Sequence, residues 1–147
     1  MTRSLFYPEA VSNLLPYDGL VEDYGVILSE AEADYYLHTF LQALAWQHDE
    51  VRIFGKYHRT ARQVAWYADA AYRYVYSGMS KQAEMWQPDL LLLKQRIEHL
   101  VGHPFNSCLA NLYADGSQAM GWHSDNENTL GQQPVIASLS LGATRKF

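Results

Sequence analysis

His123 and Asp125 are the two residues whose types and spacing best suit chemistry in this sequence. If the segment that contains them is extended, side chains two positions apart point the same way and can reach one ion. A histidine and a carboxylate, joined by a second histidine from elsewhere, form the facial triad that leaves open positions on iron(II). Because His-x-Asp is common by chance, a hydrogen-bonded surface pair is the alternative interpretation.

Asn111 and Tyr113 precede this pair on a segment whose composition predicts a strand over residues 105–113. Strand alternation would place Leu109, Asn111 and Tyr113 on one face. Asp115-Gly116 then predicts a turn. Without further context, the asparagine and the tyrosine are simply polar residues on a strand face.

Length and composition indicate a single packed domain. The chain has 147 residues, of which 48% are hydrophobic and 14% aromatic. Its one cysteine, Cys108, cannot form an internal disulfide. Because no secretory signal and no apolar run of membrane-spanning length is visible, we expect no membrane contact. The expected location is the bacterial cytosol, or the nucleus if the source is eukaryotic.

Charge is distributed unevenly along the chain. The net charge of -5 argues against coating nucleic acid by charge alone. Arg52, Lys56, Arg59 and Arg62 nevertheless fall in one segment, together with His58. This basic segment is compatible with docking on a phosphate backbone, although charge alone favours the alternative of a solvated edge of strand and turn.

Two helices have clear boundaries in the sequence. Ser29 and Glu32 form a capping box at the start of the first, after about 25 irregular residues. Pro88 opens the second helix and Gly102 ends it. The expected apolar faces are Tyr36, Leu37, Phe40, Leu41 and Leu44 in the first helix, and Leu90, Leu93, Ile97 and Leu100 in the second.

The remaining regular structure is predicted to be strand. β-branched and aromatic residues between turn signals indicate strands over 51–54, 63–67, 72–76, 105–113 and 135–141. Two helices against many short strands predict an α+β domain with a sandwich or jelly-roll sheet.

The motifs together resemble one family, the AlkB-type iron(II)- and 2-oxoglutarate-dependent dioxygenases, and most closely its animal DNA-repair homologues. Order and spacing match from about residue 50 to the end. The matching motifs are RIFGK at 52–56, AWYAD at 65–69 after Arg62, YVYSG at 74–78, NLYADG at 111–116, HSDNE at 123–127 and PVIASLSLG at 134–142. The resemblance implies iron(II), 2-oxoglutarate and dioxygen as cofactor and cosubstrates.

Roles for individual residues follow from the resemblance alone. It implies that His123 and Asp125 are iron ligands, and that Asn111 and Tyr113 contact 2-oxoglutarate. Glu127 matches an acidic position that contacts the damaged base. The positions that match the substrate-facing lid, where a flipped base is gripped, are Arg62, Tyr74, Tyr76 and Ser77. For the two lid tyrosines, ordinary cross-strand packing is the alternative.

The resemblance also implies the architecture. We expect an α+β fold with a double-stranded β-helix (jelly roll) and N-terminal helices packed on its sheet. The expected divisions are an N-terminal extension and helix over 1–50, a substrate-recognition lid over 51–80, and a helix with the first part of the core over 88–147. The family's third iron ligand, a histidine, and the arginine that binds the far carboxylate of 2-oxoglutarate are expected beyond Phe147, with the last strands.

The predicted function is therefore oxidative dealkylation of N-alkylated bases in DNA or RNA by a monomeric enzyme. With only two iron ligands, residues 1–147 alone are expected to be inactive. The alternative is a nucleic-acid-binding fragment of this fold without turnover.

Overall fold

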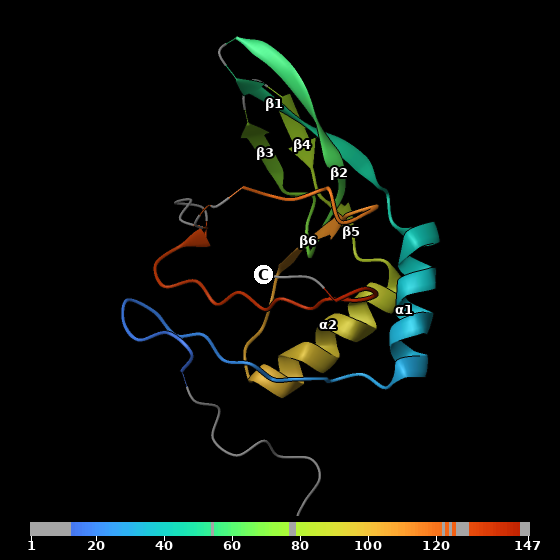
Figure 1. Cartoon of the computed structure of the whole chain (residues 1–147), viewed down its shortest axis with the longest axis vertical. Coiled ribbons are helices and arrows are strands. Elements are labelled where there is room, and N and C mark those ends of the chain that lie inside the picture. The colour runs from blue at the N-terminus through green and yellow to red at the C-terminus, as the bar shows by residue number, and fades with distance from the viewer. Residues whose placement is uncertain are drawn as a thin grey trace, which may run out of the picture.

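The computed structural model describes residues 13–53, 55–76, 79–121, 123, 125 and 130–144, with the backbone alone for 51–53, 74–76 and 79–80. Within these residues a mixed sheet and a separate hairpin stand beside two helices (Figure 1). The elements in chain order are α1 (Glu30–Ala43), β1 (Gln47–Ile53), β2 (Lys56–Ala68), β3 (Arg73–Tyr76), β4 (Met79–Gln82), β5 (Glu84–Met85), α2 (Pro88–Val101) and β6 (Ser107–Leu112).

β2 is the central strand of the larger sheet. β1 and β6 pair with it in antiparallel orientation, whereas β5 pairs with it in parallel. β3 and β4 form a two-stranded sheet of their own. Figure 1 shows both helices near one end of the larger sheet, while the β1–β2 hairpin extends away from them with β3 and β4 beside it.

The predicted capping box of α1 is confirmed. The Glu32 backbone N–H donates to Ser29 Oγ at 3.3 Å, and the Ser29 N–H donates back to the Glu32 carboxylate at 2.8 Å. Phe40 and Leu44 are buried, as the apolar face predicted, but Leu41 is 44% exposed. Leu41 follows Phe40 and is therefore rotated about 100° from it around the helix axis, away from the core.

The predicted ends of α2 are also confirmed. Pro88 occupies the first turn, and Gly102 ends the helix in the left-handed region with a φ of +68°. Leu90 and Leu93 are buried. The expectation that Leu100 points inward is wrong, because this residue of the last turn is 39% exposed.

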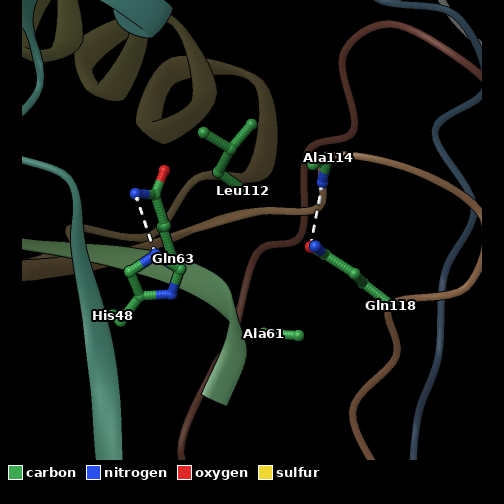
Figure 2. A pocket seen from close by; sticks show the side chains of 6 residues that line it. All are labelled: His48, Ala61, Gln63, Leu112, Ala114 and Gln118. Carbon is green, nitrogen blue, oxygen red and sulfur yellow. Dashed lines mark hydrogen bonds between the residues drawn. The ribbon is translucent and has the colours of Figure 1, made fainter. Parts of the chain in front are cut away.

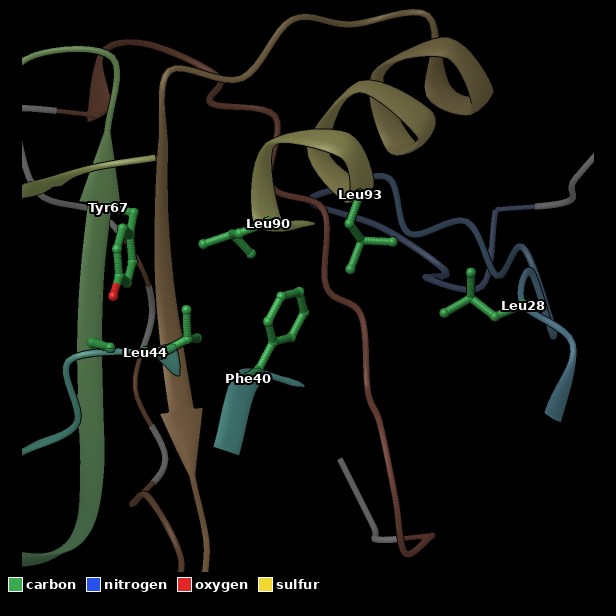
Figure 3. Close-up of a cluster of buried hydrophobic side chains, with 7 residues drawn as sticks. Leu28, Phe40, Leu44, Tyr67, Leu90 and Leu93 are labelled. Atoms are coloured by element: carbon green, nitrogen blue, oxygen red, sulfur yellow. The ribbon is translucent and has the colours of Figure 1, made fainter. Parts of the chain in front are cut away.

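The hydrophobic core joins both helices to one face of β2 (Figure 3). Ala65 and Tyr67 contribute from the strand, and the Tyr67 hydroxyl accepts a hydrogen bond from the Ala45 N–H at 2.9 Å. Fully burying a leucine or phenylalanine side chain contributes roughly 1.5–3 kcal/mol. The core therefore fixes the buried end of β2, and its remaining buried members are Leu28, Phe40, Leu44, Leu90 and Leu93.

Strand boundaries differ from the predicted ones. β1 begins before residue 51, β2 begins well before residue 63, and β6 is shorter than the predicted 105–113. The strand predicted over 72–76 corresponds to β3, while β4 and β5 were not predicted. Polar residues on the exposed part of the β1–β2 hairpin hid its length, since their pattern lacks an apolar face.

The strand predicted over 135–141 is wrong, because these residues are neither helix nor strand. Leu139 and Leu141 do pack against the core, but Val135 is 51% and Ile136 56% exposed. Alternating apolar residues suit a pleated surface, yet a strand also needs a neighbour to complete its hydrogen bonds. None of the strands that the structure describes pairs with this segment.

The two helices and the mixed sheet confirm the predicted α+β class. No helix within the described residues is long and apolar enough to cross a membrane.

Candidate metal and cosubstrate site

His123 and Asp125 lie together, as their spacing predicted. His123 Nε2 is 3.4 Å from Asp125 Oδ1, and the two side chains are 46% and 47% exposed. His123 Nδ1 lies 2.9 Å from the Gly121 carbonyl oxygen. Because a carbonyl can only accept, Nδ1 is the donor in this contact and Nε2 is the nitrogen directed toward Asp125, and a metal-binding histidine is commonly oriented by such a second contact.

The donor atoms of this pair fit a divalent iron site in part. An imidazole nitrogen and a carboxylate oxygen are two of the three ligands of the facial triad. No group of three or more histidine, cysteine, aspartate or glutamate side chains gathers among the described residues. The pair can thus supply two donors to a metal, and a third must come from elsewhere.

Asn111 lies in β6 and is oriented by Arg62 of β2. The Arg62 Nη1 donates a hydrogen bond to Asn111 Oδ1, which identifies the oxygen of the amide. Among the described residues, the opposite end, Nδ2, has one long contact, at 3.4 Å from the Leu109 carbonyl oxygen. Asn111 therefore presents a donor, and a donor is what a carboxylate such as that of 2-oxoglutarate requires.

Strand register explains why Arg62 reaches Asn111. Val64 pairs with Asn111 across the β2–β6 ladder, and Gln63 pairs with Leu112. Side chains alternate between faces, so Arg62, Val64 and Asn111 share one face, and Tyr113 follows them just after β6. The other face, which includes Ala65, packs on the helices.

A cavity of about 240 Å³ lies on this other face (Figure 2). His48 Nε2 and Gln63 Nε2 are 3.5 Å apart at one side of it, and the Ala114 N–H donates to Gln118 Oε1 at 2.9 Å at the other. The cavity is therefore separate from the Asn111 face. Its lining residues are His48, Ala61, Gln63, Leu112, Ala114 and Gln118.

Two residues near Arg62 were missed by the sequence analysis. Asp49 of β1 lies with its Oδ2 4.0 Å from Arg62 Nη2, and it forms a close ion pair with Lys81 of β4. The sequence did contain one signal for the Asp49–Arg62 contact. Asp49 is an acidic residue shortly before the basic segment, and that segment folds back on it.

The structure brings some predicted site residues together and not others. None of the hydrogen bonds and ion pairs between described residues links His123 or Asp125 to Arg62 or Asn111. The tyrosines at 74 and 76 lie on β3, but their side chains, like all of Ser77 and Glu127, lie outside the described residues. In the basic segment, Lys56 and Arg59 are exposed, whereas the Arg62 side chain is only 11% exposed.

Comparison with known proteins gives one family match. Residues 24–147 match the model of the 2OG-Fe(II) oxygenase superfamily. The chain is 40% identical over 141 residues to human alpha-ketoglutarate-dependent dioxygenase alkB homolog 3, a match that covers 95% of this chain and 46% of that protein. It is 37% identical over 137 residues to mouse DNA oxidative demethylase ALKBH2, covering 88% of this chain and 56% of the relative.

The similarity extends to a plant protein. The Arabidopsis thaliana DNA oxidative demethylase ALKBH2 is 33% identical over 109 residues, which cover 71% of this chain and 34% of that protein. The chain spans about half the length of its mammalian relatives. The resemblance to AlkB-type dioxygenases is confirmed, and the chain belongs to the 2OG-Fe(II) oxygenase superfamily.

Proposed function

We propose that this protein catalyses oxidative dealkylation of N-alkylated bases in nucleic acid, using iron(II), 2-oxoglutarate and dioxygen. The observation that supports this most directly is the His123–Asp125 pair, in which the imidazole Nε2 lies beside a carboxylate oxygen, in a chain of this superfamily. The names of its relatives, a dioxygenase and a DNA oxidative demethylase, point to the same chemistry.

In this proposal His123 and Asp125 hold iron(II) through Nε2 and a carboxylate oxygen. When bound, iron(II) with 2-oxoglutarate and dioxygen supplies the oxidation of the alkyl carbon, after which the base is released repaired and an aldehyde departs. The Gly121 carbonyl orients the His123 ring. Asn111, held by Arg62, offers its Nδ2 to a carboxylate oxygen of 2-oxoglutarate, and Tyr113 contacts the same molecule from the same face.

The substrate is proposed to bind at the lid formed by residues 51–80. Tyr74 and Tyr76 would provide aromatic faces for a base that has left its stack, worth about 1–3 kcal/mol per stacked base. Arg62 and Ser77 would contact the nucleic acid beside them. Glu127 would accept a charge-assisted hydrogen bond from an alkylated, cationic base. Pairing of β3 with β4 gives this lid a defined backbone.

The fold proposed for the whole enzyme is a monomeric jelly roll on which the N-terminal helices pack. Superfamily membership supports the jelly roll. Within it, residues 1–50 form the N-terminal extension and helix, and 88–147 the second helix and the first part of the core. A second histidine ligand and an arginine for 2-oxoglutarate would complete the site, in the bacterial cytosol or the eukaryotic nucleus.

The direct test is formaldehyde release from a methylated oligonucleotide, with and without 2-oxoglutarate. It is run on residues 1–147 and on any longer form of the protein. Release that depends on 2-oxoglutarate and iron(II) is expected from a form with all three ligands. Oligonucleotide binding without release from every such form would instead identify a binding module.

Glu127 allows a sharper test of the substrate. Glu127→Ala is expected to reduce repair of cationic adducts more than repair of neutral ones, because the carboxylate interacts with the charge. Equal losses on all adducts, together with loss of 2-oxoglutarate decarboxylation in the absence of substrate, would place Glu127 at the metal instead.

A further inference from the structure

Asp49 occupies an irregular position in the β1–β2 hairpin. The register shifts between His48 and Glu50, so the short step from 48 to 50 on β1 lies opposite the longer step from 63 to 59 on β2. Such a bulge interrupts the ladder and turns side chains away from their regular directions. Asp49 is the residue at the interruption.

Thr60 fixes the conformation of this bulge. The Asp49 N–H donates to Thr60 Oγ1 at 3.0 Å, and the Thr60 hydroxyl donates in turn to the Arg62 carbonyl at 2.9 Å. His48 Nδ1 lies 2.9 Å from the Thr60 carbonyl oxygen. Three backbone groups at the bulge are therefore bonded, and the bulge places the Asp49 carboxylate beside Arg62.

The Asp49 carboxylate contacts two cations from different parts of the fold. Lys81 comes from β4 of the β3–β4 hairpin, and Arg62 comes from β2, the strand that pairs with the Asn111 strand β6. The Arg62 and Asp49 side chains are 11% and 20% exposed, so solvent screens this contact less than it screens an open surface pair. One charged group thus connects the β3–β4 hairpin to the residue that orients Asn111.

We propose that Asp49 is a positioning residue that couples the β3–β4 hairpin to the 2-oxoglutarate-binding face, through Lys81 on one side and Arg62 and Asn111 on the other. This inference rests on the proposed function of the same site. A nucleic acid on this hairpin competes for Lys81 through its phosphates, which changes how firmly Asp49 holds Arg62. Coupling of this kind is reciprocal, so 2-oxoglutarate must affect nucleic acid affinity by the same factor.

The test measures 2-oxoglutarate binding by calorimetry to an iron(II)-loaded form of the protein that includes all three metal ligands, without oxygen, with and without a methylated oligonucleotide. In the wild type, the oligonucleotide is expected to change the Kd for 2-oxoglutarate. Asp49→Asn should weaken 2-oxoglutarate binding by about tenfold, the equivalent of one charge-assisted hydrogen bond. It should also remove the effect of the oligonucleotide.

Three further variants separate positioning from a general loss of stability. Lys81→Met should remove the oligonucleotide effect with a smaller change in the Kd itself. Thr60→Val keeps the Asp49 carboxylate but loses the side-chain hydrogen bonds that fix the bulge. It should therefore weaken 2-oxoglutarate binding in the same direction as Asp49→Asn, but less. If Asp49→Asn fails to fold, Thr60→Val replaces it in the test. Glu50→Gln is the matched control, because Glu50 is the exposed carboxylate next in sequence and should behave as wild type.

Two results would overturn the inference. One is a wild type in which the oligonucleotide leaves the Kd for 2-oxoglutarate unchanged, and the other is a folded Asp49→Asn with wild-type binding in both conditions. The readout does not depend on dealkylation. If the wild type shows the coupling yet releases no aldehyde from any alkylated oligonucleotide, the proposed function fails while the inference stands.

Discussion

The face that presents Asn111 and the segment that contains His123 are held by different kinds of contact. Asn111 lies in a strand that pairs with β2 over residues 63–68, and Arg62 fixes its amide. His123 lies outside the helices and strands, and its partners among the described residues, the Gly121 carbonyl and Asp125, are both two residues away. The first region is positioned by the sheet, whereas the second is positioned by its own neighbours.

This difference separates two contributions to a site. Contacts across strands fix geometry before any ligand binds, which is the preorganisation that a binding face needs. A local pair that is about half exposed would gain its final geometry from the metal that we propose it binds. Substitutions in the two regions should therefore have different effects on chemistry and on stability.

The largest effect is expected at the ligand pair. His123→Ala or Asp125→Ala should reduce dealkylation by an active form to background, since loss of a ligand empties or distorts a three-ligand site. The Tm should change little, because both side chains are about half exposed. Formaldehyde release and thermal unfolding measure the two effects.

The control for this experiment is His99→Ala, which removes an exposed histidine of α2. It should retain wild-type activity. Substantial turnover by His123→Ala would show that the metal is held elsewhere.

The next largest effect concerns Cys108, on the same strand as Asn111. Burial raises the pKa of this thiol from 9.0 to about 11. Since the thiolate is the reactive form, alkylation by iodoacetamide at pH 8 should be about 100-fold slower in the folded protein than in urea. Because the folded pKa is raised, the stability gained from the neutral thiol is present below pH 9 and is lost as the pH rises toward 11.

Labelling of Cys108 also tests the contrast between the two regions. Mass spectrometry should find the same slow rate in His123→Ala, because the sheet does not depend on the ligand pair. Rapid labelling of that variant would show that the sheet does depend on the pair, and would remove the distinction.

A roughly tenfold effect is expected at Arg62. Arg62→Gln should weaken 2-oxoglutarate binding by about this factor, because Asn111 loses the charged donor that orients its amide. The affinity for an oligonucleotide should fall less, since the arginine side chain is only 11% exposed. Calorimetry gives the first quantity and fluorescence anisotropy the second.

Lys56→Gln is the matched variant, because Lys56 is an exposed cation of the same strand. If the basic segment contacts phosphate, this change should lower oligonucleotide affinity and flatten its salt dependence without affecting 2-oxoglutarate. The opposite pattern, with Arg62→Gln affecting the oligonucleotide alone, would assign Arg62 to the substrate only.

The smallest effect is expected for Glu32 of α1, which forms an ion pair with Arg96 of α2 between the two helices that support the sheet. Hydrogen bonds from Ser29 and an ion pair with Arg96 lower the pKa of Glu32 from 4.5 to about 2. Because the folded pKa is depressed, this stabilisation is complete above pH 4.5 and is lost as the pH falls toward 2. Glu32→Gln should lower the Tm slightly at pH 7, and the difference in Tm from the wild type should shrink as the pH falls from 4.5 toward 2.

Glu30→Gln provides the comparison for this variant, since Glu30 lies in the same exposed first turn but outside the capping box. A difference between wild type and Glu32→Gln that persists unchanged at pH 2 would exclude the carboxylate as its source.

The helices could be predicted from the sequence because their signals are local. Ser29 with Glu32 starts one helix, and Pro88 and Gly102 bound the other, all within a few residues of the backbone groups that they satisfy. Strands depend on distant partners. Residues 135–141 have a suitable pattern, but none of the described strands pairs with them.

The same distinction applies to the candidate site. The His123–Asp125 contact spans two residues, and its spacing alone predicted it. Arg62 and Asn111 are separated by 49 residues, and Asp49 and Lys81 by 32, so these contacts depend on strand register and on a bulge. Strand register depends on how whole strands pair and not on the residue type at one position. The contacts of Arg62 with Asn111 and of Asp49 with Lys81 therefore could not be predicted from the sequence.

The alternation of β2 between its two faces limits how the length of the chain can vary. One residue inserted or deleted between Arg62 and Ala65 would either move Ala65 and Tyr67 out of the core or turn Arg62 toward the helices, depending on which part of the strand keeps its register. Such a change would therefore disrupt either the packing or the site. Viable insertions and deletions in this strand are therefore expected near the hairpin turn at Gly55. An added Cβ at Gly55 would meet no atom within 4 Å, so the turn has space around it. The φ of +78° nevertheless favours glycine at that position.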